Sequence, residues 1–182
     1  MKMTAGGFEI LRKHFGTLEQ SFVDGVNLVV TESENQGLEY NQTAYVLATA
    51  YHESAGTFLP VKEAYWLSEN WRKKNLRYYP YYGRGLVQIT WKENYLKAGQ
   101  KLGYGDQFAN NPDMVMDQDI SVKILVLGSK EGWFTGKKLS DYINRTTGKK
   151  DYKQARRIIN GTDKAQKIAD EALIFEKALR SY

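Results

Sequence analysis

The fold of this chain is decided by Thr43-Ala44-Tyr45-Val46-Leu47-Ala48-Thr49-Ala50-Tyr51-His52, a mostly apolar run that is followed directly by Glu53. A helix over residues 41–53 is apolar on almost every side, which is typical of a buried, central helix. Burying a charged carboxylate costs free energy, so a glutamate at the inner end of such a helix needs a partner or a task. Desolvation raises the pKa of a carboxyl group, and a general acid must keep its proton near neutral pH. Glu53 is therefore a candidate general acid, or else a surface glutamate at a helix end.

Most of the remaining chain also has helical patterns. Apolar spacing and stop residues predict helices at residues 8–15, 17–37, 68–74, 91–102, 120–133, 139–143, 152–160 and 164–180, with another opening at Pro112. Thr17, Asn41 and Thr90 are the expected N-caps of three of these helices. Gly148-Lys149-Lys150 is expected to be a solvated turn.

Regular patterns break down between residues 55 and 90, where aromatic residues are dense and a short strand is expected at 86–89. Long irregular segments in compact domains usually carry function. We therefore predict a mainly α, single catalytic domain over residues 1–182, with a small irregular/β insertion at about 55–90. The cleft is expected between this insertion and the helix that ends at Glu53.

Composition narrows the classes of function. The chain has no cysteine, which excludes disulfides and thiolate metal sites, and two histidines far apart, so neither a metal nor a cofactor is expected. No apolar run is long enough to span a bilayer, and the N-terminus lacks the apolar core of a secretory signal. A net charge of +5 favours an anionic partner, although a basic surface can also serve solubility alone.

Glu63 is the candidate for a second carboxylate. It lies in the irregular segment, which can fold back opposite the helix end at Glu53. Hydrolysis of a glycosidic bond requires two carboxyl groups, one that protonates the leaving oxygen and one that activates water. Glu69 and Glu93 compete for this role, but Glu69 lies in a polar stretch and Glu93 in a first helical turn, where a carboxylate complements the helix dipole.

The segment Gly83-Arg84-Gly85-Leu86-Val87-Gln88-Ile89-Thr90 is the second candidate site element. Two glycines around Arg84 allow a tight turn and a close approach of the backbone to a ligand. Gln88 and Thr90 alternate with apolar residues, so both are expected on one face, where they can bind sugar hydroxyls or hold a water molecule. A plain turn with Thr90 as N-cap is the alternative.

Together these residues resemble a known family. Five segments are similar to the signature of the glycoside hydrolase family 19 chitinases, most of all to that of their bacterial and phage endolysin branch. They are His52-Glu53-Ser54, the second glutamate, Tyr82 to Thr90, Asn94-Tyr95 and the late Arg157-Ile158-Ile159-Asn160-Gly161. The resemblance covers residues 41–98 and resumes at 157–161. It departs from the plant enzymes in a shorter interval between the glutamates, in the missing cysteines and in Thr162, where family members tend to have glycine.

The resemblance implies a lysozyme-like, two-lobed helical fold and an inverting mechanism. Glu53 is then the general acid, Glu63 the general base and Thr90 the residue that positions water. The residues expected to line the sugar groove are His52, Tyr82, Arg84, Gln88, Asn94, Tyr95 and Asn160.

The leading hypothesis is a phage-type endolysin, a lysozyme-like antimicrobial hydrolase that cuts the β-1,4 bonds of peptidoglycan and lyses the host cell. Such an enzyme is expected to be a monomer without stable membrane insertion, held in the host cytoplasm until a holin-type pore releases it to the cell wall. A chitinase and a lytic transglycosylase on the same scaffold are the alternatives, followed by a non-catalytic wall-binding protein. Nucleic-acid binding is not expected, because Arg72-Lys73-Lys74 and Lys149-Lys150 are isolated clusters without a recognition motif.

Overall fold

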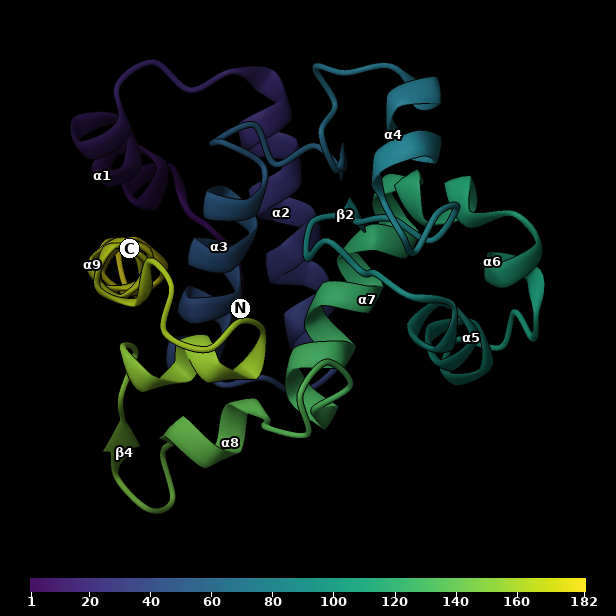
Figure 1. The fold of residues 1–182 in the computed structure, drawn as a ribbon. Coiled ribbons are helices and arrows are strands. Elements are labelled where there is room, and N and C mark those ends of the chain that lie inside the picture. Colours follow the sequence, from purple (N-terminus) through teal and green to yellow (C-terminus); the bar gives the residue numbers. More distant parts are fainter.

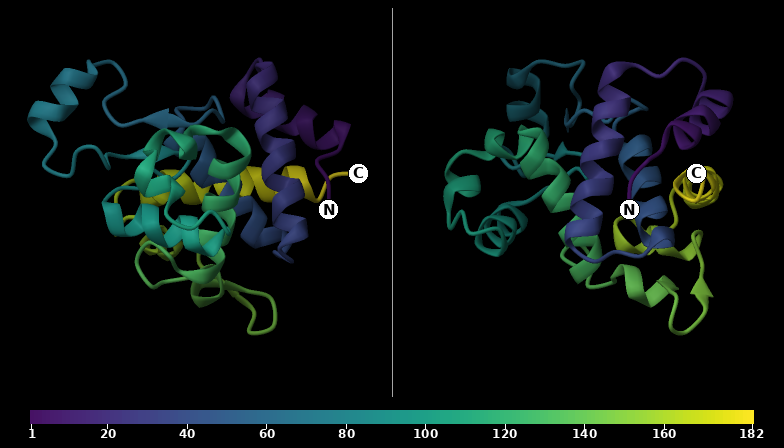
Figure 2. Two further views of the ribbon diagram at one scale, coloured as in Figure 1. Left: turned by 90° about the vertical axis from the view of Figure 1, so that its right-hand side faces the viewer. Right: turned by 180° about the vertical axis from the view of Figure 1, so that it is seen from behind.

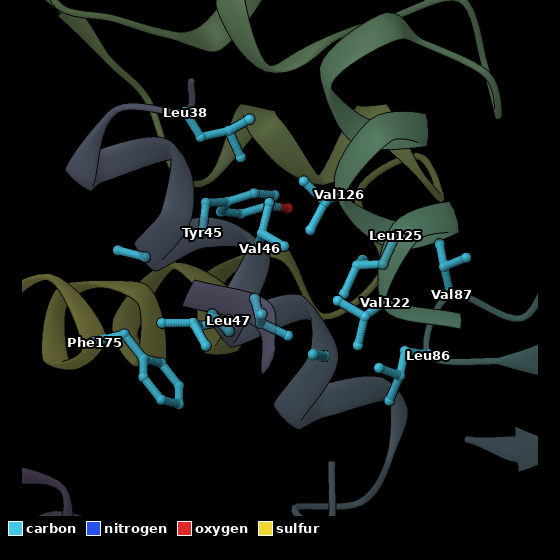
Figure 3. Packing of buried hydrophobic residues seen from close by; sticks show 14 of the residues in the cluster. Leu38, Tyr45, Val46, Leu47, Leu86, Val87, Val122, Leu125, Val126 and Phe175 are labelled. Atoms are coloured by element: carbon cyan, nitrogen blue, oxygen red, sulfur yellow. The ribbon is translucent and has the colours of Figure 1, made fainter. Parts of the chain in front are cut away.

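The helix α3 (Tyr40–Glu53) lies at the centre of the protein, whose computed structural model describes all residues from 1 to 182. Three helices surround it: α2 (Gln20–Asn35), α7 (Gln118–Glu131) and α9 (Ala165–Leu179) (Figure 1). Every residue from Thr43 to Ala50 is buried, which confirms the prediction of a buried central helix. The packing is seen in Figure 3, where α3 side chains lie between Phe175 of α9 and Val122, Leu125 and Val126 of α7.

Nine α-helices and four two-residue strands make up the chain. The helices not yet given are α1 (Ala5–Phe15), α4 (Glu69–Asn75), α5 (Lys92–Lys101), α6 (Gln107–Asn110) and α8 (Leu139–Tyr142), and the two 3-10 helices are η1 (Pro112–Met116) and η2 (Gln154–Ile158). The mainly helical fold class is therefore confirmed, as is the opening of a short helix at Pro112. None of the helices has both the length and the apolar character needed to cross a lipid bilayer.

The predicted N-caps are wrong in all three cases. Helix α2 begins only at Gln20, after Glu19, and α5 follows Trp91. The cap of α3 is Glu39 rather than Asn41, because Glu39 and Gln42 exchange hydrogen bonds between side chain and backbone in a capping box.

The insertion folds as an arm that stands away from the helical body. Strand β1 (Val61–Lys62) pairs antiparallel with β2 (Arg84–Gly85), and α4 lies at the far end of the arm between them (Figure 2). The strand expected at 86–89 is wrong, because Arg84 and Ile89 exchange both backbone hydrogen bonds and so close a tight turn instead. Gly85, with φ of 88°, supplies the left-handed conformation that this turn needs.

The segment after α8 differs from the expectation too. Strands β3 (Ile143–Asn144) and β4 (Lys149–Lys150) form an antiparallel hairpin, where a plain turn had been predicted. The helix expected over 152–160 is only the 3-10 helix η2.

A single cluster of 38 buried hydrophobic residues runs from Met3 to Leu179. It includes residues near both ends of the insertion, such as Phe58 and Leu86. Phe58, at the start of the insertion, is fully buried and packs against Phe22 with ring centroids 4.9 Å apart. This contact requires Gly25 on α2, because a Cβ atom there would lie 2.3 Å from the Cβ atom of Phe58. The core thus fixes the point at which the irregular segment leaves α3.

Substitution of Gly25 by alanine tests this anchoring. We expect Gly25→Ala to lower the free energy of unfolding by about 1–3 kcal/mol, because the added methyl group overlaps Phe58 in a filled core. The matched control is Asn27→Ala on the exposed face of the same helix, which should change stability by less than about 0.5 kcal/mol. Urea unfolding followed by circular dichroism measures both, and equal stability of the two variants would contradict the proposed contact.

Candidate active site

A pocket of about 450 Å³ lies where α3 meets the insertion. Its wall on one side is the end of α3 and the residues that follow it, including Glu53 and Ser54. The other wall comes from the arm, with Val61, Lys62 and Tyr65. The structure therefore brings together the two segments between which the sequence predicts a cleft.

Glu53 lines this pocket and has a charged partner. Its Oε1 atom accepts a hydrogen bond from Nη1 of Arg156 at 3.1 Å, and the two side chains are 17% and 3% exposed. Arg156 also donates from Nε to the backbone oxygen of Asp163, so its guanidinium group is fixed from two directions. The half-buried carboxylate thus has the partner that its position at the helix end requires.

Sequence reasoning missed Arg156. The available signal was its place directly before the late segment 157–161, which the resemblance singles out. Because the two partners are 103 positions apart in the chain, no local pattern connects them.

Glu63 is held in a defined orientation directly after β1. Its Oε1 atom accepts a hydrogen bond from the hydroxyl group of Tyr78 at 2.6 Å, and its Oε2 atom accepts one from the backbone N–H of Gly83 at 2.9 Å. Its own backbone N–H donates to the carbonyl oxygen of Gly83 at 2.7 Å. Each carboxylate oxygen retains a lone pair for one further donor, such as a water molecule.

Arg72 fixes the turn that carries Glu63. This buried side chain of α4 donates from Nε to the carbonyl oxygen of Glu63 at 2.8 Å and from Nη2 to that of Ala64 at 3.0 Å. Arg72 itself lines the pocket, so the pocket directly touches the anchor of Glu63. Ala55, which lines the pocket, and Ala64, which directly follows Glu63, both have φ of 51°, a conformation that costs an alanine about 1–2 kcal/mol.

Three residues expected to line the sugar groove are buried instead. Tyr82 and Tyr95 are 0% exposed and Arg84 is 3% exposed. The Arg84 guanidinium lies 3.8 Å from the ring centroid of Tyr82 and donates to the hydroxyl group of Tyr95 and to Oδ1 of Asp113. Direct sugar binding by these three side chains is therefore wrong for this structure, since Tyr82 and Arg84 are buried in the arm and Tyr95 is buried on α5.

Gln88, Thr90 and Asn94 are half-buried and linked in series. Gln88 donates from Nε2 to the carbonyl oxygen of Val61 in β1, Thr90 donates to that of Gln88, and Asn94 donates to that of Thr90. The expected alternation of Gln88 and Thr90 on one face is wrong, because Gln88 has φ of 55° and leaves the extended conformation. The positioning of water by Thr90, and sugar contacts of Gln88 and Asn94, stay predictions.

His52 and Asn160 lie near the Glu53 end of the site. His52 is half-buried beside Glu53, and burial lowers its pKa. Asn160 is exposed, and its backbone N–H donates to the carbonyl oxygen of Arg156 at 2.9 Å, which places it next to the partner of Glu53. Their contacts with a sugar also stay predictions. No three His, Cys, Asp or Glu residues lie together in a way that suits a metal ion.

Comparisons with known proteins bear on the family and the fold. The sequence profile of the family described as "Chitinase class I" matches residues 31–137. The "Acidic 26 kDa endochitinase" of Solanum lycopersicum is 49% identical over 47 residues, which are 25% of this chain and 19% of that protein. The "Inactive chitinase-like protein 1" of Hevea brasiliensis is 47% identical over 47 residues, which are 25% of this chain and 14% of that protein. The chain thus spans less than a fifth of the length of these relatives.

A solved structure extends the likeness to the whole chain. The crystal structure of a bacterial family 19 chitinase has a TM-score of 0.67 and 22% sequence identity, and the match covers 99% of this chain and 96% of that one. At this identity the comparison speaks for the fold alone, and it confirms the expected lysozyme-like helical fold.

The hydrogen bond between Tyr78 and Glu63 predicts a pH dependence of stability. Burial and this hydrogen bond raise the pKa of Tyr78 to about 12, above the ordinary value of about 10 for tyrosine. Between these two values the unfolded chain releases the proton and the folded protein keeps it, so stability is lost as the pH rises through this window. We expect Tyr78→Phe to unfold with a shallower dependence on pH between about 10 and 12 than the wild type.

Urea unfolding at a series of alkaline pH values measures this difference. The matched control is Tyr65→Phe, since Tyr65 is 64% exposed and its removal should leave the slope of the wild type. Equal slopes for the wild type and Tyr78→Phe would show that the hydroxyl group of Tyr78 does not hold Glu63.

Proposed function

The chain belongs to glycoside hydrolase family 19, the class I chitinase family, and on this premise we propose that it hydrolyses β-1,4 glycosidic bonds between amino sugars, with Glu53 as general acid and Glu63 as general base. The observation that carries the proposal is a pocket that Glu53 lines from the end of α3 and that Arg72, which fixes the turn at Glu63, lines from the arm. Arg156 pairs with Glu53, whereas Tyr78 and Gly83 hold Glu63. Two carboxyl groups that are each held in a fixed orientation are what this chemistry needs.

The hydrogen-bond partners of Glu53 and Glu63 support the roles of acid and base in different ways. When Glu53 protonates the leaving oxygen it gains a negative charge, and Arg156 is placed to stabilise that charge as it forms. Glu63 accepts two hydrogen bonds that orient its carboxylate and leave lone pairs for the attacking water molecule. Proton donation and water activation are thus assigned to separate segments, α3 and the arm.

As the substrate we propose bacterial peptidoglycan, which makes the protein a phage-type endolysin with lysozyme activity. The net charge of +5 supports this choice over uncharged chitin, because a basic protein is attracted to an anionic wall. In this proposal the enzyme is a monomer that stays in the host cytoplasm until a holin-type pore releases it to the cell wall.

Chitin is the second candidate substrate. The observation that favours it is the identity of 49% to an endochitinase over 47 residues. The relative named as inactive, at 47% identity over a stretch of the same length, keeps a non-catalytic binding protein among the outcomes to be tested.

Substitution of each proposed catalytic glutamate tests the mechanism. We expect Glu53→Gln and Glu63→Gln each to lower the rate of hydrolysis by about a hundredfold or more, since each removes one proton-transfer group. The matched control is Glu93→Gln in the first turn of α5, which is exposed and should keep the rate of the wild type. Turbidity loss of permeabilised bacterial cells and release of reducing sugar from chitin measure the two candidate activities.

The products decide between the remaining alternatives. New reducing ends on muropeptides support wall hydrolysis, and soluble oligosaccharides released from chitin alone support the chitinase. A lytic transglycosylase would form anhydro ends and would lose little activity in Glu63→Gln. Absence of any product from either polymer with the wild-type protein would overturn the enzymatic proposal.

The anomeric form of the first product is a separate prediction. If Glu63 activates water on the face opposite the leaving group, a β-linked substrate gives the α-anomer first. Proton NMR of a soluble oligosaccharide during the first turnovers measures this ratio. Initial formation of the β-anomer would contradict the role of Glu63 as a base.

A further inference from the structure

A second pocket of about 490 Å³ lies at the opposite end of α3 from Glu53. The N-terminal residues of α3 and the β3–β4 hairpin line it, together with the end of α9. Four of its lining side chains are cationic, namely Arg145, Lys149, Lys150 and Arg180. We propose that this pocket, called the basic pocket below, binds phosphate groups of a flexible anionic polymer.

The carboxylates of the protein neutralise only part of the positive charge of the basic pocket. The single carboxylate in its lining, Glu39, accepts hydrogen bonds from the backbone N–H groups of Arg145 and Gln42 and pairs with no cationic side chain. Arg145 and Lys149 are exposed, and no carboxylate pairs with their side chains. Two cations therefore remain available to an anion from solvent.

The other two cations are held in place. Glu176 accepts hydrogen bonds from Lys150 at 3.2 Å and from Tyr152 at 2.8 Å, and it lies 3.6 Å from Nε of Arg180. Arg180 also donates to Oδ1 of Asn41 at 2.8 Å and lies 5.2 Å from the ring centroid of Tyr40. One half-buried carboxylate thus positions two cations, which reduces the entropy lost when an anion binds between them.

The shape and chemistry of the basic pocket favour one kind of ligand. An arginine presents several N–H donors in a fixed fork that suits phosphate oxygens, and lysines add point charges around it. A concave site of this size admits a flexible single chain, whereas a stiff duplex meets such a pocket only at its rim.

The basic pocket is separate from the candidate active site. Helix α3 has 14 residues, so at 1.5 Å per residue its two ends are roughly 20 Å apart. A chain held in the basic pocket leaves the pocket at Glu53 open. Anion binding therefore does not depend on the proposed hydrolysis, and either proposal can fail without the other.

Isothermal titration calorimetry with four polymers tests the proposal on the full chain. The probes are linear polyphosphate, poly(glycerol phosphate), poly-glutamate and duplex DNA of equal total charge. We expect the two flexible phosphate polymers to bind with salt-dependent affinity and to exceed poly-glutamate and duplex DNA. Tighter binding of duplex DNA would overturn the proposal in favour of a nucleic-acid surface, and equal binding of poly-glutamate would overturn the preference for phosphate.

The diagnostic variant is Arg145→Gln/Lys149→Gln, which removes the two cations without carboxylate partners. We expect it to weaken binding of the phosphate polymers about tenfold or more and to make the dependence of log K on log salt shallower by about 1 to 2. Its melting temperature and its activity on soluble oligosaccharides should equal those of the wild type, because neither side chain is buried or near Glu53.

The matched control is Lys13→Gln/Lys177→Gln. These two lysines are exposed, line a different pocket between α1 and α9, and give the same change in net charge. The control variant should bind like the wild type. Equal weakening by both double variants would show that net charge alone attracts the polymer, and no binding by the wild type at low salt would overturn the site outright.

Discussion

The ion pair between Glu53 and Arg156 joins the end of the central helix to a 3-10 helix more than a hundred residues later in the chain. Burial of α3 on every side forces this arrangement, because a helix enclosed by α2, α7 and α9 meets solvent only at its ends. A carboxylate at such an end is partly desolvated, and only a cation brought there by the rest of the fold can compensate it. The packing of α3 in the core and the position of this wall of the site are therefore linked through Arg156.

The arm that carries Glu63 is built on a different principle. Two of its buried side chains are arginines. Arg72 donates to carbonyl oxygens of the turn at Glu63, and Arg84 lies between Tyr82 and Tyr95. Directional hydrogen bonds set positions more sharply than apolar contacts do. The wall with the proposed base is thus fixed by polar geometry, while the wall with the proposed acid is fixed by packing.

The difference between a wall fixed by packing and a wall fixed by hydrogen bonds explains which parts of the structure could be predicted from the sequence. Periodicity predicted α3, α7 and α9 within a few residues, since each has an apolar pattern that directly reflects burial. It also indicated Glu53, because an acid beside an apolar run stands out. The turn at Gln88 and the partner Arg156 were missed, because one depends on a rare backbone conformation and the other on a contact between distant segments. The cap at Glu39 was missed although its capping box with Gln42 is local. Tyr82, Arg84 and Tyr95 were found through family likeness but assigned to the ligand rather than to the interior.

Ala55 and Ala64, the two alanines with a left-handed backbone near Glu53 and Glu63, have a consequence for how the protein can vary. Glycine at Ala55 or Ala64 would relieve the steric cost of a positive φ. It would also let the backbone beside each catalytic candidate sample many more orientations, in the folded as well as the unfolded chain. Glycine at either position would therefore remove backbone strain but loosen the placement of the neighbouring glutamate, whereas alanine keeps that placement at the cost of the strain.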